Sequence, residues 1–367
     1  MKFSVSQSSL EVALSVVSKG MASNSTIPIL SGVYLRAQEG TLELQATDLT
    51  ISIRHKIPAN VEEPGETVVS GRILTSIVKT LPDAAVTFEA EAHGVSITCD
   101  KSSFRLNALE SADFPEFPAY ELSRSVELPS EVLSQMVSKV YRVTSKDSSR
   151  PILQGVQLTV ENNTIRLVAT DSYRLAVCDT HVETAGLAEP FSTIVPGATF
   201  HEVLGLPSMT DKILVGTTES QVVFAFGNTT FISRRIEGNF PNYRQLLSGN
   251  CSTSVKIPTA EFASALKRVS VIATSNPSVR FDVDAEGGVM TLAASAPDQG
   301  ESSETLSVEV EGNNVVIALN HRFVADCVGA VGNVDTMTLE LEGAMRPGVF
   351  KSYGDINYLY LLMPVRL

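Results

Sequence analysis

The chain contains an internal repeat, which restricts its fold more than any other feature of the sequence. At a constant offset of 123 residues the first segment can be laid over the second, and the matching positions are Leu10 with Leu133, Pro28-Ile29-Leu30 with Pro151-Ile152-Leu153, Gly32 with Gly155, Leu35 with Leu158, and Ala46-Thr47-Asp48 with Ala169-Thr170-Asp171. Phe114-Pro115 and Phe240-Pro241 match at an offset of 126, so an intervening loop differs in length by three residues (126 − 123). Tandem copies of one domain are therefore expected.

A third copy is fainter. Residues 254–262 follow the pattern of residues 125–133, and Leu128 and Leu133 fall on Ile257 and Phe262. The sequence therefore predicts three domains, at 1–122, 123–252 and 253–367. A chain of 367 residues is long enough for each domain to bury its own core, and a period this long indicates tandem domains and not a solenoid.

Each copy combines helices with alternating strands. Apolar residues at i, i+4 and i+7, such as Leu10, Leu14 and Val17, predict helices over residues 7–19, 71–80, 130–142, 197–206, 259–272 and 320–331. Alternating runs at 33–37 and 42–46, and again at 156–160 and 165–169, predict hairpins with turns at Glu39-Gly40 and Asn162-Asn163. The predicted fold class is α+β, with two helices and antiparallel sheets in each domain.

Charge is distributed unevenly. The net charge of −13 would repel nucleic acid if it were uniform. The predicted helices, however, carry eight basic and five acidic residues, or +8 − 5 = +3, which leaves −16 for the rest. Basic helices in an acidic protein suit a surface that faces a polyanion. The alternative is that Lys and Arg are simply good helix formers at solvated positions.

Most of these basic residues, with two more on the loop that follows the third helix, are the DNA-facing candidates: Arg72, Lys79, Lys139, Arg142, Lys146, Arg150, Lys267, Arg268 and Arg322.

The sequence has no pattern that predicts catalysis, metal binding or a cofactor. It contains no G-x-x-x-x-G-K-[ST] loop, no H-x-x-x-H pair and no C-x-x-C pair. Asp48 and Asp171, duplicated between copies, are interpreted as turn-capping residues and not as catalytic carboxylates. The four cysteines are interpreted as buried free thiols. No secretory or membrane-spanning segment is evident, so a cytoplasmic location is expected.

The three-fold repeat resembles the bacterial beta sliding clamp family, the beta subunit of DNA polymerase III. The strings that carry the resemblance are Met1-Lys2-Phe3, 27–30 (Ile-Pro-Ile-Leu), 169–178 (Ala-Thr-Asp-Ser-Tyr-Arg-Leu-Ala-Val-Cys), 239–244 (Asn-Phe-Pro-Asn-Tyr-Arg) and 363–367 (Met-Pro-Val-Arg-Leu). The resemblance implies a non-catalytic processivity factor. It also implies two chains joined head to tail in a ring whose helices line the hole around double-stranded DNA.

The same resemblance implies two further contact surfaces. The first domain of one chain would meet the third domain of the other, through Phe104 and Leu106 against Val271 and Ile272. A cleft between the second and third domains would accept short linear peptides from the polymerase III catalytic subunit, the clamp loader, other polymerases and repair proteins. Its wall would be formed by Leu153, Thr170, Ser172, Tyr173, Arg174, Leu175, Pro241, Leu246, Asn320, Phe323, Met363, Pro364, Val365 and Arg366. The alternative for Leu153, Leu175 and Phe323 is an ordinary core position.

This sequence departs from the family pattern at two positions. Asn24 stands where relatives carry an Arg near DNA, and Gln245 replaces the second Arg of the Phe-Pro-x-Tyr-Arg-Arg string. Two other functions are alternatives for a chain of this composition. A scaffold of three β-rich domains would bind proteins and never DNA, and a hydrolase would turn over a substrate.

Overall fold

The computed structural model describes residues 1–22, 25–91, 94–183, 189–247, 251–273 and 276–366. Their contacts divide the chain into two compact units. Met1–Leu133 and His201–Arg235 form the first unit, and Ser134–Glu183, 189–200 and 236–366 form the second. The second copy of the repeat therefore contributes residues to both units.

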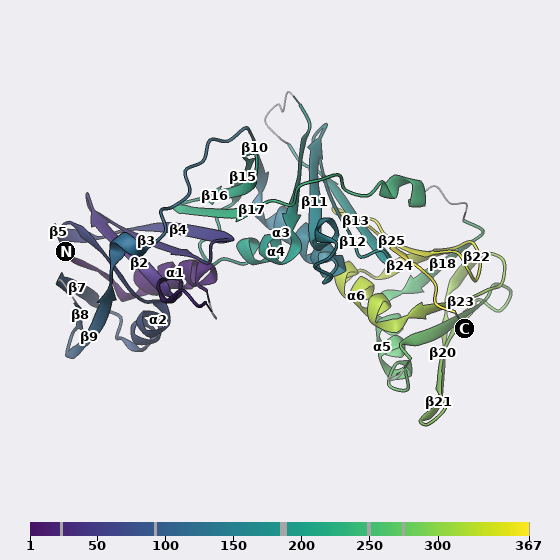
Figure 1. The fold of residues 1–367 in the computed structure, drawn as a ribbon. Coiled ribbons are helices and arrows are strands. Elements are labelled where there is room, and N and C mark those ends of the chain that lie inside the picture. The colour runs from purple at the N-terminus through teal and green to yellow at the C-terminus, as the bar shows by residue number, and fades with distance from the viewer. Residues whose placement is uncertain (23–24, 92–93, 184–188, 248–250, 274–275, 367) are drawn as a thin grey trace. The chain divides into compact units, whose positions relative to one another are not determined.

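The first unit is built on one antiparallel sheet of thirteen strands (Figure 1). In spatial order they are β10 (Arg124–Pro129), β15 (Lys212–Thr217), β16 (Gln221–Phe226), β17 (Thr229–Arg234), β4 (Ile51–Pro58), β3 (Thr41–Thr47), β2 (Gly32–Gln38), β6 (Gly65–Ser70), β9 (Ser102–Leu109), β8 (Gly94–Cys99), β7 (Ala85–Glu91), β1 (Lys2–Ser6) and β5 (Asn60–Glu63). The pairing of β17 with β4, from Thr229 opposite His55 to Ser233 opposite Ile51, joins strands of neighbouring repeats.

The second unit contains two antiparallel sheets. The nine-stranded sheet has the order β14 (Phe191–Pro196), β11 (Gly155–Glu161), β12 (Thr164–Thr170), β13 (Arg174–His181), β26 (Asn357–Leu362), β25 (Gly348–Ser352), β24 (Thr336–Leu341), β18 (Thr253–Pro258) and β22 (Glu309–Gly312). The four-stranded sheet has the order β21 (Gly300–Ser307), β20 (Val289–Ala296), β19 (Ser278–Asp284) and β23 (Val315–Asn320). The β13–β26 pair joins the second repeat to the third.

Six α-helices lie within the described residues: α1 (Gln7–Val17), α2 (Gly71–Thr80), α3 (Ser130–Val140), α4 (Gly197–Leu204), α5 (Thr259–Val269) and α6 (His321–Val331). In the first unit α1 packs on β3 and β4 and against α2. In the second, α5 packs on β20 and β21, and α6 on β23 and β26 (Figure 1). Leu10, Leu14 and Val17 are buried on one face of α1, as their spacing predicts.

Four predicted helices are too long at their C-terminal ends. The α-helical segments end at Val17, Val140, Leu204 and Val269. The first two continue into 3₁₀ turns, η1 (Ser18–Gly20) and η4 (Tyr141–Val143). Apolar spacing cannot distinguish a last α-turn from a 3₁₀ turn, because both keep residues three apart on one side.

The predicted hairpin turns are confirmed. Glu39 and Gly40 have φ of 52° and 75°, and Asn162 and Asn163 have φ of 49° and 59°. Left-handed backbone at both central residues is the conformation of a type I′ turn, which matches the twist of the two strands that it joins. Asn and Gly tolerate that conformation best, so the sequence places each hairpin correctly.

Candidate functional site around Arg174

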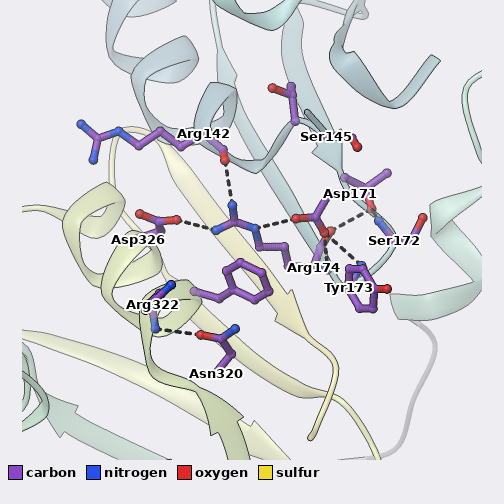
Figure 2. Close-up of polar contacts among 12 residues, drawn as sticks. Arg142, Ser145, Asp171, Ser172, Tyr173, Arg174, Asn320, Arg322 and Asp326 are labelled. Atoms are coloured by element: carbon purple, nitrogen blue, oxygen red, sulfur yellow. Dashed lines mark hydrogen bonds and ion pairs between the residues drawn. The ribbon is translucent and has the colours of Figure 1, made fainter. Parts of the chain in front are cut away.

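The turn between β12 and β13 is built by the duplicated Thr-Asp pair. Asp171 Oδ1 accepts the backbone N–H groups of Tyr173 and Arg174 at 3.0 Å each, and the Thr170 hydroxyl donates to the Arg174 carbonyl at 2.8 Å. Ser172 completes the turn with φ of 79°. The turn directs Tyr173 outward, where it is 63% exposed, and Arg174 inward (Figure 2).

The first repeat forms the same turn. Asp48 Oδ1 accepts the N–H groups of Thr50 and Ile51 at 2.8 and 2.7 Å, and the Thr47 hydroxyl donates to the Ile51 carbonyl at 2.7 Å. The interpretation of the duplicated aspartates as turn-capping residues is therefore confirmed. The copies differ at the three positions after the Asp, and the last of these places Arg174 in the second repeat where the first repeat has Ile51.

The Arg174 side chain is 8% exposed and lies at the centre of a polar network (Figure 2). Its guanidinium donates to Asp171 Oδ2 at 3.0 Å, Asp326 Oδ2 at 2.6 Å, the Tyr360 hydroxyl at 3.1 Å and the Arg142 carbonyl at 2.8 Å. These groups come from the turn, α6, β26 and η4. One planar guanidinium therefore joins four segments, which the single ammonium of a lysine could not match.

An aromatic ring and the local charges complete this network. The Arg174 guanidinium carbon lies 4.1 Å from the centre of the Phe323 ring, within the range of a cation–π contact. Burial acts to lower the pKa of Arg174, but Tyr360, Asp326 and Asp171 outweigh it and raise the pKa. Arg174 therefore keeps its charge at neutral pH, and its ion pairs are formed by a permanent cation.

The residues of the predicted cleft differ in exposure. Buried residues are Leu153, Arg174 and Leu175; half-buried residues are Thr170, Asn320, Phe323, Pro364 and Val365; and exposed residues are Ser172, Tyr173, Pro241, Leu246, Met363 and Arg366. Leu153 and Leu175 are core residues, as the alternative interpretation expects. The Arg174 guanidinium makes four hydrogen bonds within the chain, so its role among the predicted cleft residues is to hold the surrounding segments together.

Several of these residues lie together although they are far apart in the sequence. The Met363 N–H donates to the Tyr173 carbonyl at 2.9 Å, and the Val365 N–H donates to the Ala318 carbonyl at 2.9 Å. The last described residues are thus held between the turn and β23. The Arg150 guanidinium donates to the Ser172 hydroxyl at 3.1 Å, which links the loop after η4 to the same turn.

An apolar patch continues from the turn along the face of the nine-stranded sheet on which residues 240–247 pack. Leu175, Val177, Val168 and Leu361 form its floor, and the partly buried residues packed against them are Phe240, Tyr243, Leu247, Val349 and Leu359. Tyr243 and Leu247 belong to the 3₁₀ turn η6 (Tyr243–Leu247), which also presents Leu246 with 56% exposure. Exposed apolar and aromatic side chains beside a buried floor are suited to binding a peptide.

The nine DNA-facing candidates are exposed except Lys139, which is half-buried. The Lys139 ammonium donates to the Ala330 and Val331 carbonyls at 2.5 and 3.3 Å, and it lies 5.6 Å from the Tyr358 ring centre. Burial lowers its pKa. Lys139 therefore caps the C-terminal end of α6, while its contact with DNA stays a prediction. Arg268 is paired with Glu304, and Arg150 with Asp147 at 2.9 Å.

The predicted dimer residues are only partly buried. Phe104 and Leu106 on β9 are half-buried, Ile272 is half-buried, and Val271 is 67% exposed. Asn24 lies outside the described residues.

The four cysteines of the chain are free thiols. Cys99, Cys178 and Cys327 are buried free thiols, but Cys251 is exposed, so the prediction for Cys251 was wrong. Cys251 lies two residues before the first residue of β18 and outside any apolar strand pattern. Among the described residues no three His, Cys, Asp or Glu side chains gather as they would around a metal ion. No helix in that part of the chain is both long and apolar enough to cross a membrane.

Family models match the whole chain in three consecutive parts. The N-terminal, central and C-terminal domains of the DNA polymerase III beta subunit match residues 1–118, 127–242 and 244–366. The chain belongs to the DNA polymerase III beta subunit family. The prediction of a three-domain α+β clamp fold is thereby confirmed, and the family is the sliding-clamp processivity factor, which is non-catalytic.

The similarity to members of this beta subunit family extends over the full length of the chain. The beta sliding clamp of Synechococcus elongatus is 29% identical over 374 residues and covers 100% of both chains. The sliding clamp structure from Bacillus subtilis has a TM-score of 0.93 at 27% identity, covering 100% of this chain and 99% of that one. The beta subunit structure from Thermotoga maritima has a TM-score of 0.91 at 28% identity, with the same coverage.

Proposed function

We propose that this beta subunit closes into a ring with a second copy, encircles duplex DNA in the cytoplasm and holds partner proteins there. The full-length match to sliding clamps is the observation that carries the proposal. Its domains span residues 1–122, 123–252 and 253–367. The partners are the polymerase III catalytic subunit, the clamp loader, and other polymerases and repair proteins, each of which binds the cleft through a short peptide.

Two free strand edges support ring closure. β9 pairs with β8 along its length, but on its other side it pairs with β6 only at Ala108 and Leu109. Among the described residues, β21 is an edge strand that pairs with β20 alone. Unpaired edges favour association with another strand. The edges also carry residues of opposite charge, Arg105 on β9 and Glu301 and Glu304 on β21; within the single chain Arg105 is paired with Glu91 at 3.1 Å and Glu304 with Arg268.

In the proposed ring, β9 of one chain pairs with β21 of the other, and the contact is repeated by two-fold symmetry. Phe104 and Leu106 would then be covered by Val271 and Ile272 of the second chain. Closure would bury an apolar residue, Val271, that is 67% exposed in the single chain. It would also remove two strand edges per subunit.

Enclosure explains how an acidic chain can work on DNA. A ring cannot leave a closed circle without opening, so it needs no strong phosphate contacts. The exposed candidates Arg72, Lys79, Arg142, Lys267 and Arg322 supply weak contacts, and the net charge of −13 opposes tight binding elsewhere. DNA affinity should therefore be low and should fall steeply with salt concentration.

Retention on circular DNA tests the proposal. The purified protein is loaded onto nicked plasmid by a clamp loader, the plasmid is linearised, and the bound fraction is followed. A ring stays on circles and slides off free ends. If linearisation changes nothing, the protein binds by ordinary contacts or not at all, and the scaffold alternative is favoured.

A pair of matched variants tests the closure. Val271→Asp places a charge in the proposed contact and should abolish retention. Leu49→Asp changes another exposed apolar residue, 53% exposed, and should retain circles as the wild type does. Equal retention by the Val271→Asp variant and the wild type would contradict this contact.

A further inference from the structure

A cavity of about 470 Å³ lies between η6 and the outer face of β12, β13 and β26. None of the predicted cleft residues lines it. We propose that this cavity is a second subsite of the clamp, which takes an acidic and aromatic segment next to the partner peptide in the cleft. The inference rests on the peptide-binding function proposed above.

The walls of the cavity combine an apolar floor with two tyrosines. Val177 and Leu359 stand opposite each other in the β13–β26 ladder and form the floor. Tyr243 from η6 and Tyr353 from the β25–β26 turn also line it, and Tyr353 is 73% exposed. Tyrosines offer a large, rigid contact surface at low entropic cost, so the cavity fits an aromatic side chain of a ligand.

The charges around the cavity favour an anionic ligand. Arg166 is paired with Asp179 at 3.4 Å, and Asp179 also accepts the Asn357 amide at 3.2 Å. Arg244 is exposed and has no ion-pair partner within the part of the chain that the structure describes. One unneutralised guanidinium thus remains at the rim, where a carboxylate of the ligand can reach it.

The apolar patch joins the lining of the cavity to Leu175, a residue of the predicted cleft. Val177, Leu359, Tyr243 and Leu247 line the cavity, and they pack in the same cluster as Leu175 of the cleft. Leu175 and Val177 are two residues apart on β13, or about 7 Å in an extended strand. A peptide bound over Leu175 therefore needs only two or three more residues to reach the cavity.

The test compares three fluorescent peptides by anisotropy on the full-length protein. The first is the clamp-binding segment of the polymerase III catalytic subunit, and the other two carry Glu-Tyr-Glu at its N-terminus or its C-terminus. On the wild type, one extension should raise affinity by about five-fold, as one exposed ion pair and one aromatic contact would. Arg244→Glu and Tyr353→Ala should remove this gain and leave the unextended peptide unaffected.

Arg280→Glu, on the separate sheet of β19, serves as the control and should keep the gain. If both extended peptides bind the wild type no better than the unextended one, the subsite is refuted while the cleft stands. If the gain persists in both Arg244→Glu and Tyr353→Ala, the extension binds elsewhere and the subsite is again refuted. If no peptide binds, the cleft assignment is wrong and the subsite falls with it.

Discussion

Replacing Arg174 by methionine should destabilise the second unit by about 3 kcal/mol. Removing one partner of a buried ion pair costs about 3–5 kcal/mol when the other charge is left uncompensated. Here the cost falls at the low end. The Asp171 carboxylate keeps the two backbone N–H groups of its turn, and Asp326 is 34% exposed and can be hydrated. The Arg142 carbonyl loses the Arg174 donor.

The change in unfolding free energy is measured by urea denaturation followed by circular dichroism, since the chain contains no Trp. Hydrogen exchange of β13 and α6 then shows where protection is lost. Asp326→Asn alone should cost about 1 kcal/mol, because only one bond is weakened. The double variant should cost less than the sum of the two single changes, because both remove the same contact.

Arg280→Met is the matched control, because Arg280 belongs to the same unit but its ion pair with Asp282 is about half exposed on both sides. Its effect should stay within about 0.5 kcal/mol. If Arg174→Met also costs less than about 1 kcal/mol, the network contributes little free energy. The role assigned to this guanidinium would then be wrong.

Three other predictions concern separate features. Lys139→Gln should lower the unfolding free energy by about 1–2 kcal/mol and leave the salt dependence of DNA binding unchanged. Arg72→Gln should instead reduce, by about one, the slope of the logarithm of the DNA-binding constant against the logarithm of the salt concentration. Equal slopes for the Lys139→Gln and Arg72→Gln variants would contradict the different roles given to these two residues. Burial lowers the pKa of His55, so the folded state resists its protonation. The contribution of His55 to the unfolding free energy is therefore full above its ordinary pKa of about 6.5 and is lost as the pH falls below that value. Urea titrations of a His55→Gln variant should show an unfolding free energy that depends less on pH. Gly155→Ala should lower the unfolding free energy by about 1–3 kcal/mol, and with it the melting temperature, because the added Cβ would lie 2.3 Å from a methyl group of Ile194. Gly329→Ala lies on α6, where the added Cβ would meet no atom, and should raise the unfolding free energy by about 0.5–1 kcal/mol and with it the melting temperature. If the melting temperatures of the two glycine variants shift in the same direction, the steric argument is refuted.

Local chemistry was predictable from the sequence. The helix over 71–80 has the predicted bounds, because the Pro82 that follows stops it. The hairpin at Asn162-Asn163 and the turn at Asp171 were also predictable, because a few neighbouring residues determine each of them.

Arg174 shows why the rest was not predictable. Family resemblance placed it in the cleft wall, but its partners Asp326 and Tyr360 are 152 and 186 positions further along the chain. Both partners sit in ordinary amphipathic patterns, on α6 and β26, that carry no sign of a buried cation. The capping role of Lys139 was not predictable for the same reason, since the carbonyl groups that it caps lie 191 and 192 positions away.

The strand pairs β17–β4 and β13–β26 make the repeats depend on one another. A fragment that stops at residue 122 keeps β4 and its ladder with β3 but loses β17, so the other edge of β4, from Ile51 to His55, is left unpaired. A fragment that starts at residue 253 exposes β26 in the same way. Exposed edges of this kind recruit other strands. The duplicated segments are therefore not interchangeable parts. A chimaera that takes its central repeat from a relative must preserve both strand pairs at once, whereas one that exchanges the first or the third repeat must preserve one of them.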